Sequence, residues 1–151
     1  MAQAFDFTRL RRLTVIHAVV QLFLLILLAG SAYLFLIRVP SASVLGSIVR
    51  VVVIQLALFY PIYRFATSDA EREVASAAST LTADEQNALR RKRVFSDIVK
   101  GAIFIFFVVF TLRAPGAAPV QFMILSLFLL SYLCYFQCFN HAAKRLMKEK
   151  G

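Results

Sequence analysis

Three charged residues at the start of one apolar stretch have the types and spacing to act together. Asp97 lies four residues after Arg93 and three residues before Lys100, and these intervals place all three on one face of a helix. A carboxylate between two cations can anchor a helix at a membrane surface, take part in a proton or ion relay, or contact polar groups of a partner helix. The residues alone leave these three interpretations open.

The stretch that carries these charges is one of four long apolar segments. The chain has 151 residues, of which 60% are hydrophobic and 17% are charged. The segments cover residues 13–37, 44–63, 94–112 and 120–139. Each is close to the roughly 20 residues that a helix needs to cross a bilayer. We therefore predict an all-α, polytopic membrane protein of one domain, with four transmembrane helices arranged as two antiparallel hairpins.

The third segment is apolar without interruption only over residues 101–112, which is 12 residues or about 18 Å of helix. The hydrocarbon core of a bilayer is roughly 30 Å thick. The span must therefore include residues 94–100, and Asp97 and Lys100 are drawn below the membrane surface. Charges at this depth are costly, which makes them candidates for a function.

The net charge of +9 has a topological explanation. Basic residues gather before the first span, between the second and third spans, and after the fourth, whereas the other two connections hold only Arg38 and Arg113. The positive-inside rule then places both termini, the loop 64–93 and the tail 140–151 in the cytoplasm, as in a bacterial inner membrane protein. We expect the tail to contact the anionic lipids of the inner leaflet, and we expect no nucleic-acid partner.

The loop 64–93 contains two capping-box patterns, at residues 68–71 and 82–85. In this pattern a hydroxyl group and a Glu three residues later bind the free amides at a helix start. We predict two short helices separated by a break near residues 79–82, with the second helix continuing into the third span.

Other short signals predict how the spans meet. Pro61 indicates the end of the second helix. The brief connection 38–43 predicts that the first two helices pack closely, and the small residues 29–32 predict a close helix approach. The connection 113–119, with two prolines and a glycine, predicts a compact turn between the third and fourth helices.

Arg50 is a further charge inside a predicted span. It lies 14 residues from Arg64, or about 21 Å along a helix, and all eight acidic residues fall on the predicted cytoplasmic side or just inside it. Arg50 therefore either extends to lipid phosphates or meets a carboxylate of another subunit. Together with Asp97, Lys100 and Arg93, it is our candidate for contact with a partner or an ion.

Cys134, Cys138 and His141 have spacings that place them on one face of the fourth helix, and His17 lies at a similar depth on the first. Such residues can bind haem or a soft metal ion, but their spacing matches no established ligand motif. We expect packing roles for them and predict no cofactor and no metal site. Because motifs for phosphate binding and nucleophilic catalysis are also missing, we predict no catalytic residues and no enzymatic activity.

The run Ser96-Asp97-Ile98-Val99-Lys100 resembles the opening of the third helix in the bacterial ATP synthase protein I family, and Gly46 and Pro61 are weaker similarities. The paired glycines of the family's second helix are reduced here to one, and the central loop is longer. The resemblance implies a small, basic, four-helix membrane protein that assists assembly of a rotary ATP synthase. It also implies that Asp97, Lys100 and Arg50 meet polar groups of a partner subunit.

We therefore expect a non-enzymatic accessory or assembly subunit that contacts other transmembrane subunits. Two alternatives remain open from the sequence. One is a small oligomeric transporter of an ion or solute, and the other is a haem- or metal-binding subunit of a redox complex.

Overall fold

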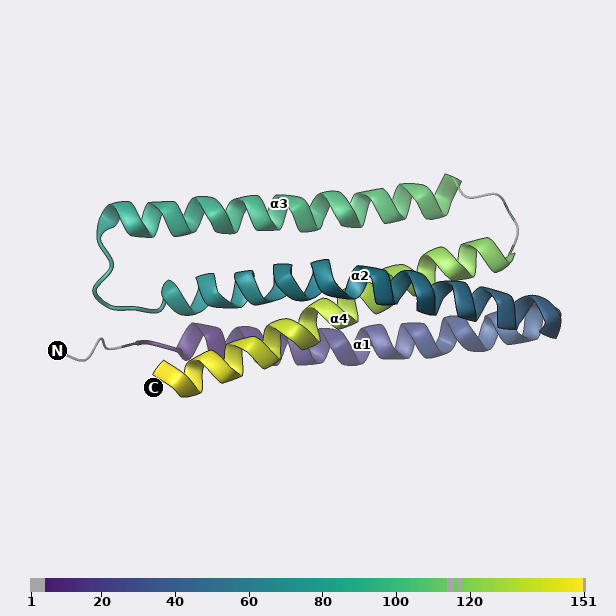
Figure 1. The fold of residues 1–151 in the computed structure, drawn as a ribbon, viewed down its shortest axis with the longest axis horizontal. Helices are drawn as coiled ribbons and strands as arrows, with labels where there is room; N and C mark the ends of the chain where they lie inside the picture. Colours follow the sequence, from purple (N-terminus) through teal and green to yellow (C-terminus); the bar gives the residue numbers. More distant parts are fainter. Residues whose placement is uncertain (1–4, 114–115, 117, 151) are drawn as a thin grey trace.

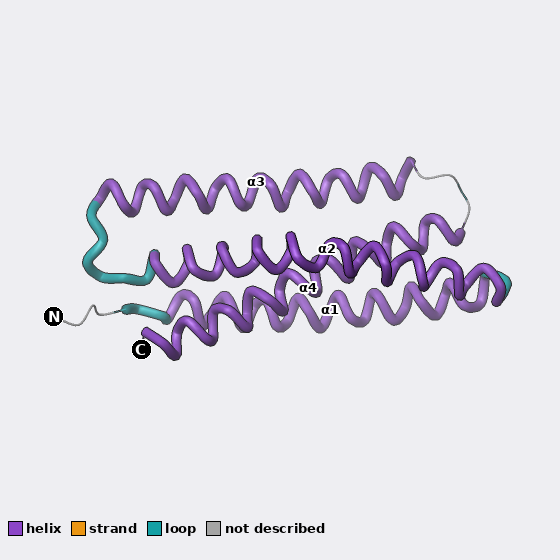
Figure 2. Tube along the Cα trace, viewed as in Figure 1, coloured by secondary structure: helices purple, strands orange, loops and turns teal. Residues whose placement is uncertain are grey.

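The computed structural model describes residues 5–113, 116 and 118–150, except for the side chains of residues 41 and 42. It contains four helices: α1 (Thr8–Arg38), α2 (Ser41–Ala75), α3 (Ala83–Arg113) and α4 (Ala118–Lys150). Figure 2 shows that helices make up nearly all of the described chain. Three of the seven residues of the turn predicted at 113–119, namely 114, 115 and 117, lie outside the described residues.

All four helices are long and apolar enough to cross a membrane. Most of their large apolar side chains are exposed on the outside of the protein, for example Phe106 on α3 and Leu56 on α2. Such a surface suits the hydrocarbon core of a bilayer. The chain is therefore an integral membrane protein with an all-α, four-helix fold, as predicted.

Consecutive helices run in opposite directions (Figure 1). Residues 5–12, 64–93 and 140–150 gather at the same end of the bundle, which we call the charged end. The packing does not follow the order of the chain, because α4 packs mainly on α2 and then on α1. The predicted close packing of α1 on α2 is wrong, because these helices make few contacts with each other and each packs mainly on α4.

The main core lies at the charged end, where α1, α2 and α4 meet. Ala66, Ala70 and Ala143 have no exposed surface, and Phe139 is 2% exposed. The alanines let the backbones of α2 and α4 approach closely, which is the usual packing device of membrane helices. Of the residues 29–32 predicted to allow a close helix approach, Ala29 and Gly30 are exposed, and a Cβ added to Gly30 would meet no atom within 4 Å, whereas Ser31 and Ala32 are half-buried.

Helix α2 extends well beyond its predicted end. It passes through Pro61 and ends at Ala75, so the capping box predicted at residues 68–71 lies inside a helix and starts none. A proline removes one backbone hydrogen bond, but packing of Ala66 and Ala70 on α4 continues beyond it. Transmembrane helices tolerate proline where neighbouring helices support the backbone.

The second capping box is confirmed. The Glu85 carboxylate accepts hydrogen bonds from the Thr82 amide (2.9 Å) and hydroxyl (2.8 Å), and the Glu85 amide donates to the Thr82 hydroxyl at 3.4 Å. These bonds lower the pKa of the Glu85 carboxyl. Helix α3 starts at Ala83 and continues without a break into the third span, as predicted.

Helix α3 stands apart from the other three. Figure 1 shows it along one side of the bundle, farthest from α1. Its contacts are with α4 and α2, and they are far fewer than those between α2 and α4. Ser96 is the one buried residue that α3 contributes among the described residues. What holds α3 against α2 is therefore polar, and it lies at the charged end.

Candidate functional site

The centre of the polar contacts is Asp69, a residue of α2 that is 3% exposed. Its carboxylate accepts hydrogen bonds from Ser96 Oγ at 2.7 and 2.9 Å and from Tyr135 Oη at 2.7 Å. It also forms ion pairs with Lys100 Nζ at 2.9 Å and with Arg72 Nη1 at 3.0 Å. One carboxylate thus joins α2, α3 and α4.

A second buried carboxylate, Glu73, lies one turn further along α2. It accepts two hydrogen bonds from the Arg93 guanidinium, at 2.7 and 2.9 Å, a bidentate arrangement that is among the strongest ion pairs in proteins. Arg93 also donates to Ser76 Oγ at 3.2 Å. Arg72 lies between the two carboxylates, 3.8 Å from Glu73, and donates to the Lys92 carbonyl oxygen at 3.0 Å.

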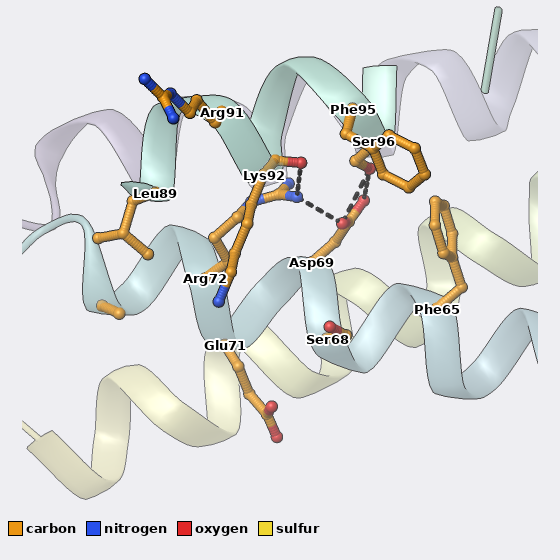
Figure 3. Close-up of a pocket in the computed structure, with 11 residues that line it drawn as sticks. Phe65, Ser68, Asp69, Glu71, Arg72, Leu89, Arg91, Lys92, Phe95 and Ser96 are labelled. Carbon is orange, nitrogen blue, oxygen red and sulfur yellow. Dashed lines mark hydrogen bonds and ion pairs between the residues drawn. The ribbon is translucent and has the colours of Figure 1, made fainter. Parts of the chain in front are cut away.

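We call this set of side chains the ion network. Its members are Asp69, Arg72, Glu73, Arg93, Ser96, Lys100 and Tyr135. The carboxylates come from α2, most of the cations come from α3, and Figure 3 shows Arg72 and Asp69 reaching from α2 toward Lys92 and Ser96. Removing one partner of a buried ion pair leaves an uncompensated charge and costs about 3–5 kcal/mol. The ion network therefore fixes the position of α3.

The structure divides the predicted site residues into two groups. Lys100 and Arg93 belong to the ion network. Asp97 remains outside it: its side chain is 64% exposed, and its one ion pair among the described residues is with Lys100 at 3.4 Å. Arg93 does not pair with Asp97 as the spacing suggested, because the nearer acceptor is Glu73. The carboxylate that bridges two cations is Asp69.

Arg50 is exposed, and among the described residues it has no acidic partner. Helix α2 begins at Ser41, at the end of the bundle opposite the charged end, and Arg50 lies in this half. Arg50 and Asp97 are thus the two candidate residues whose charged groups face outward.

Sequence reasoning missed Asp69 and Glu73. Their partners on α3 lie 20 to 31 residues away in the chain, so spacing within one helix could not reveal them. A signal does exist, because Asp69 and Glu73 are four residues apart and alternate with the buried Ala66, Ala70 and Val74. Acidic residues beside the buried stripe of a helix indicate a paired, interior position.

The residues considered for a cofactor have different surroundings. His17 packs against the rings of Phe136 and Phe139, with centroid distances of 4.7 and 4.8 Å, whereas His141 is exposed. Cys134 and Cys138 are half-buried free thiols. Across the described residues, no group of three or more His, Cys, Asp or Glu side chains could hold a metal ion.

Two cavities lie between α2 and α3, one on each side of the ion network. The first, of about 660 Å³, lies toward the charged end and is lined by charged residues that include Arg72, Arg91 and Lys92. Figure 3 shows this cavity. The second, of about 340 Å³, lies toward the middle of the bundle and is lined mostly by apolar residues such as Leu58 and Ile103, with α4 contributing Tyr132.

Polar contacts are sparse beyond the ion network. Gln55 on α2 accepts a hydrogen bond from Ser131 on α4 at 3.3 Å. The side-chain amide Nε2 of Gln21 on α1 donates to Oε1 of Gln137 on α4 at 3.5 Å. The buried hydroxyl of Ser126 has no partner among the described residues. The charges are therefore concentrated at one end of the bundle.

Comparison of the chain with protein-family models, with curated proteins and with solved structures gives no match. The structure shows a four-helix integral membrane protein in which the ion network attaches the loosely packed helix α3 to the closely packed helices α1, α2 and α4.

Proposed function

We propose that this protein is a non-enzymatic accessory or assembly subunit of a larger membrane complex. The observation that carries the proposal is the exposure of Asp97. This carboxylate lies within the predicted third span, yet its side chain is 64% exposed, and its partner Lys100 lies closer to Asp69 than to Asp97. A charge that faces outward at this depth calls for a polar partner outside the chain.

Arg50 supports the same proposal from the other half of the bundle. It is exposed and has no acidic partner among the described residues. A carboxylate or a row of polar groups on a neighbouring transmembrane subunit would satisfy it. One partner that contacts both Asp97 and Arg50 would cross most of the membrane beside this protein.

The resemblance of residues 96–100 to the ATP synthase protein I family suggests which complex to examine first, a rotary ATP synthase during assembly. The distribution of basic residues supports a bacterial inner membrane location with both termini in the cytoplasm.

The test is purification of the tagged protein from its native membrane in mild detergent, followed by identification of the subunits that accompany it. We expect Asp97→Asn and Arg50→Gln each to reduce recovery of the partner at least fivefold while membrane insertion is unchanged. The matched controls, Asp84→Asn on the same helix as Asp97 and Arg12→Gln on α1, change exposed charges at the charged end and should have little effect.

The proposal is wrong if the four variants recover partners equally well, or if the wild-type protein carries no other subunit. Reconstitution of the pure protein in liposomes distinguishes the transporter alternative, because ion or solute flux without any partner would replace the accessory function.

A further inference from the structure

The two cavities between α2 and α3 form parts of one furrow. On α2 the lining includes Leu58, Ile62, Phe65 and Arg72, which follow one another at three- to seven-residue intervals and so lie along one face of a helix. Phe65 lines both cavities. From Leu58 to Arg72 the furrow covers 14 residues of α2, about 21 Å along the helix axis.

The inner half of this furrow is apolar, because its polar groups bind elsewhere. The Tyr132 hydroxyl donates to the Lys100 carbonyl oxygen at 3.0 Å, and the Tyr135 hydroxyl donates to Asp69. Lys100 Nζ pairs with Asp69, and Ser131 donates to Gln55. What remains at the cavity of about 340 Å³ is aliphatic and aromatic surface.

The outer half of the furrow is cationic. Arg91 and Lys92 are exposed, and neither has an acidic partner among the described residues. Figure 3 shows Lys92 extending toward α2, whereas the guanidinium of Arg91, which also lines the cavity, lies on the side of α3 away from α2. Glu71 also lines this cavity, but its carboxylate points away from α3 (Figure 3). The ion network has three cations and two carboxylates, so Arg91 and Lys92 add to a positive charge in this half.

Arg72 adds an independent indication of an anionic ligand. Its side chain is 10% exposed and it lines the cationic cavity. Two of its nitrogens interact with Asp69, Glu73 and the Lys92 carbonyl, but Nε is buried and has no hydrogen-bond partner among the described residues. A buried donor without an acceptor is rare in proteins, and a shift of the Arg72 side chain into the cavity would let an oxygen of a bound anion accept from it.

From these observations we propose that the furrow between α2 and α3 binds one anionic phospholipid, with its phosphate at Arg72, Arg91 and Lys92 and an acyl chain in the apolar half beside Ile103. The polarity of the furrow changes along the direction in which the helices cross the membrane, from cationic near the surface to apolar inside. A phospholipid has the same order of chemical groups. A transmembrane helix of a partner would fill the apolar half but would leave the cations unmatched.

Single-lipid binding to the full-length protein in detergent micelles, measured by native mass spectrometry, tests the proposal. Phosphatidylglycerol should bind at least tenfold more tightly than phosphatidylcholine with the same acyl chains. The double variant Arg91→Gln/Lys92→Gln should weaken phosphatidylglycerol binding about thirtyfold, because each basic residue near an anionic headgroup contributes a factor of roughly five. The control Lys144→Gln/Lys148→Gln removes two exposed cations of α4 outside the furrow and should change binding less than threefold.

A second pair of variants tests the apolar half. Val99→Phe places a larger side chain in the inner cavity and should weaken binding at least fivefold, whereas Ile105→Phe, on an exposed face of the same helix, should not. The proposal is wrong if phosphatidylglycerol and phosphatidylcholine bind equally tightly, or if the two double charge variants weaken phosphatidylglycerol binding equally. It is also wrong if Val99→Phe folds but leaves lipid binding unchanged, or if glycerol phosphate alone binds as tightly as the lipid. Protection of the furrow by a copurified subunit instead of a lipid would also overturn it.

Discussion

The interfaces of α2 with α4 and with α3 are built on different principles. The α2–α4 interface is extensive and mostly apolar, with Ala66 and Ala70 allowing close contact. The α2–α3 interface has few contacts, two cavities and buried ion pairs centred on Asp69. Close packing fixes a helix along its whole length, whereas a group of ion pairs fixes it at one end. The comparison indicates that α1, α2 and α4 form a stable unit and that α3 can be released from it by changing one charge.

The largest effect is expected from Asp69→Ala. The variant leaves Lys100 and Arg72 without their central acceptor, so the folded protein should lose about 3–5 kcal/mol. Thermal unfolding in mild detergent, followed by the reactivity of the half-buried thiols of Cys134 and Cys138, measures the loss. Asp84→Ala, an exposed change on α3, should stay within about 0.5 kcal/mol of the wild type. Similar melting curves for the two variants would show that the ion network contributes little.

Ala70→Leu tests the other interface. Ala70 is completely buried between helices, so a larger side chain must force α2 and α4 apart and should destabilise the protein by about 1–3 kcal/mol. Unlike Asp69→Ala, this variant should keep α3 in place. Release of α3 by Ala70→Leu, detected as new proteolytic cleavage between α2 and α3, would contradict the division into a stable unit and an attached helix.

Glu73 and Arg93 should show a favourable coupling of about 1 kcal/mol. A double-mutant cycle with Glu73→Gln and Arg93→Gln measures it by the same thiol assay. The coupling is expected to be smaller than the effect of Asp69→Ala, because the Arg93 side chain is 24% exposed and Arg72 stays near Glu73. Strict additivity of the two single variants would mean that the bidentate pair does not stabilise the protein.

The smallest effect concerns the start of α3. The hydrogen bonds from Thr82 lower the pKa of the Glu85 carboxyl, so the cap contributes stability above the ordinary pKa of Glu and loses it as the pH falls through the lowered value. The protection factor of the amides in the first turn of α3, which corrects for the intrinsic pH dependence of hydrogen exchange, should therefore fall at acidic pH. Thr82→Ala removes the hydroxyl but keeps the backbone amide that also binds Glu85, so it should only reduce this pH dependence. Glu85→Gln should abolish it, and its persistence in Glu85→Gln would show that another group is responsible.

The sequence predicted the elements better than their contacts. The four spans were readable because apolar length is a local property, and the start of α3 was readable because Thr82 and Glu85 bind each other within one turn. The continuation of α2 past Pro61 could not be read from the sequence, because it depends on the packing of α2 on α4. Ser68 shows the same limit: its pattern matches a helix start, but the surrounding residues belong to a helix already under way.

The candidate site was predicted in part. Lys100 and Arg93 were found because charges at the edge of an apolar span stand out, but their partners were assigned by spacing along one helix. The acceptors, Asp69 and Glu73, come from a different helix. Only the packing of α2 on α4, which turns these carboxylates toward α3, brings the two sets of charges together.

The most direct test of the central claim is the distance between α2 and α3. Spin labels at the exposed positions Leu56 and Ile105, in a variant with Cys134 and Cys138 replaced by Ala, report this distance by pulsed electron resonance in lipid nanodiscs. With Asp69 intact we predict one narrow distribution, and with Asp69→Ala we predict a broad distribution extended to longer distances, while Asp84→Ala leaves it narrow. An unchanged narrow distribution in Asp69→Ala would contradict the claim that the ion network holds α3.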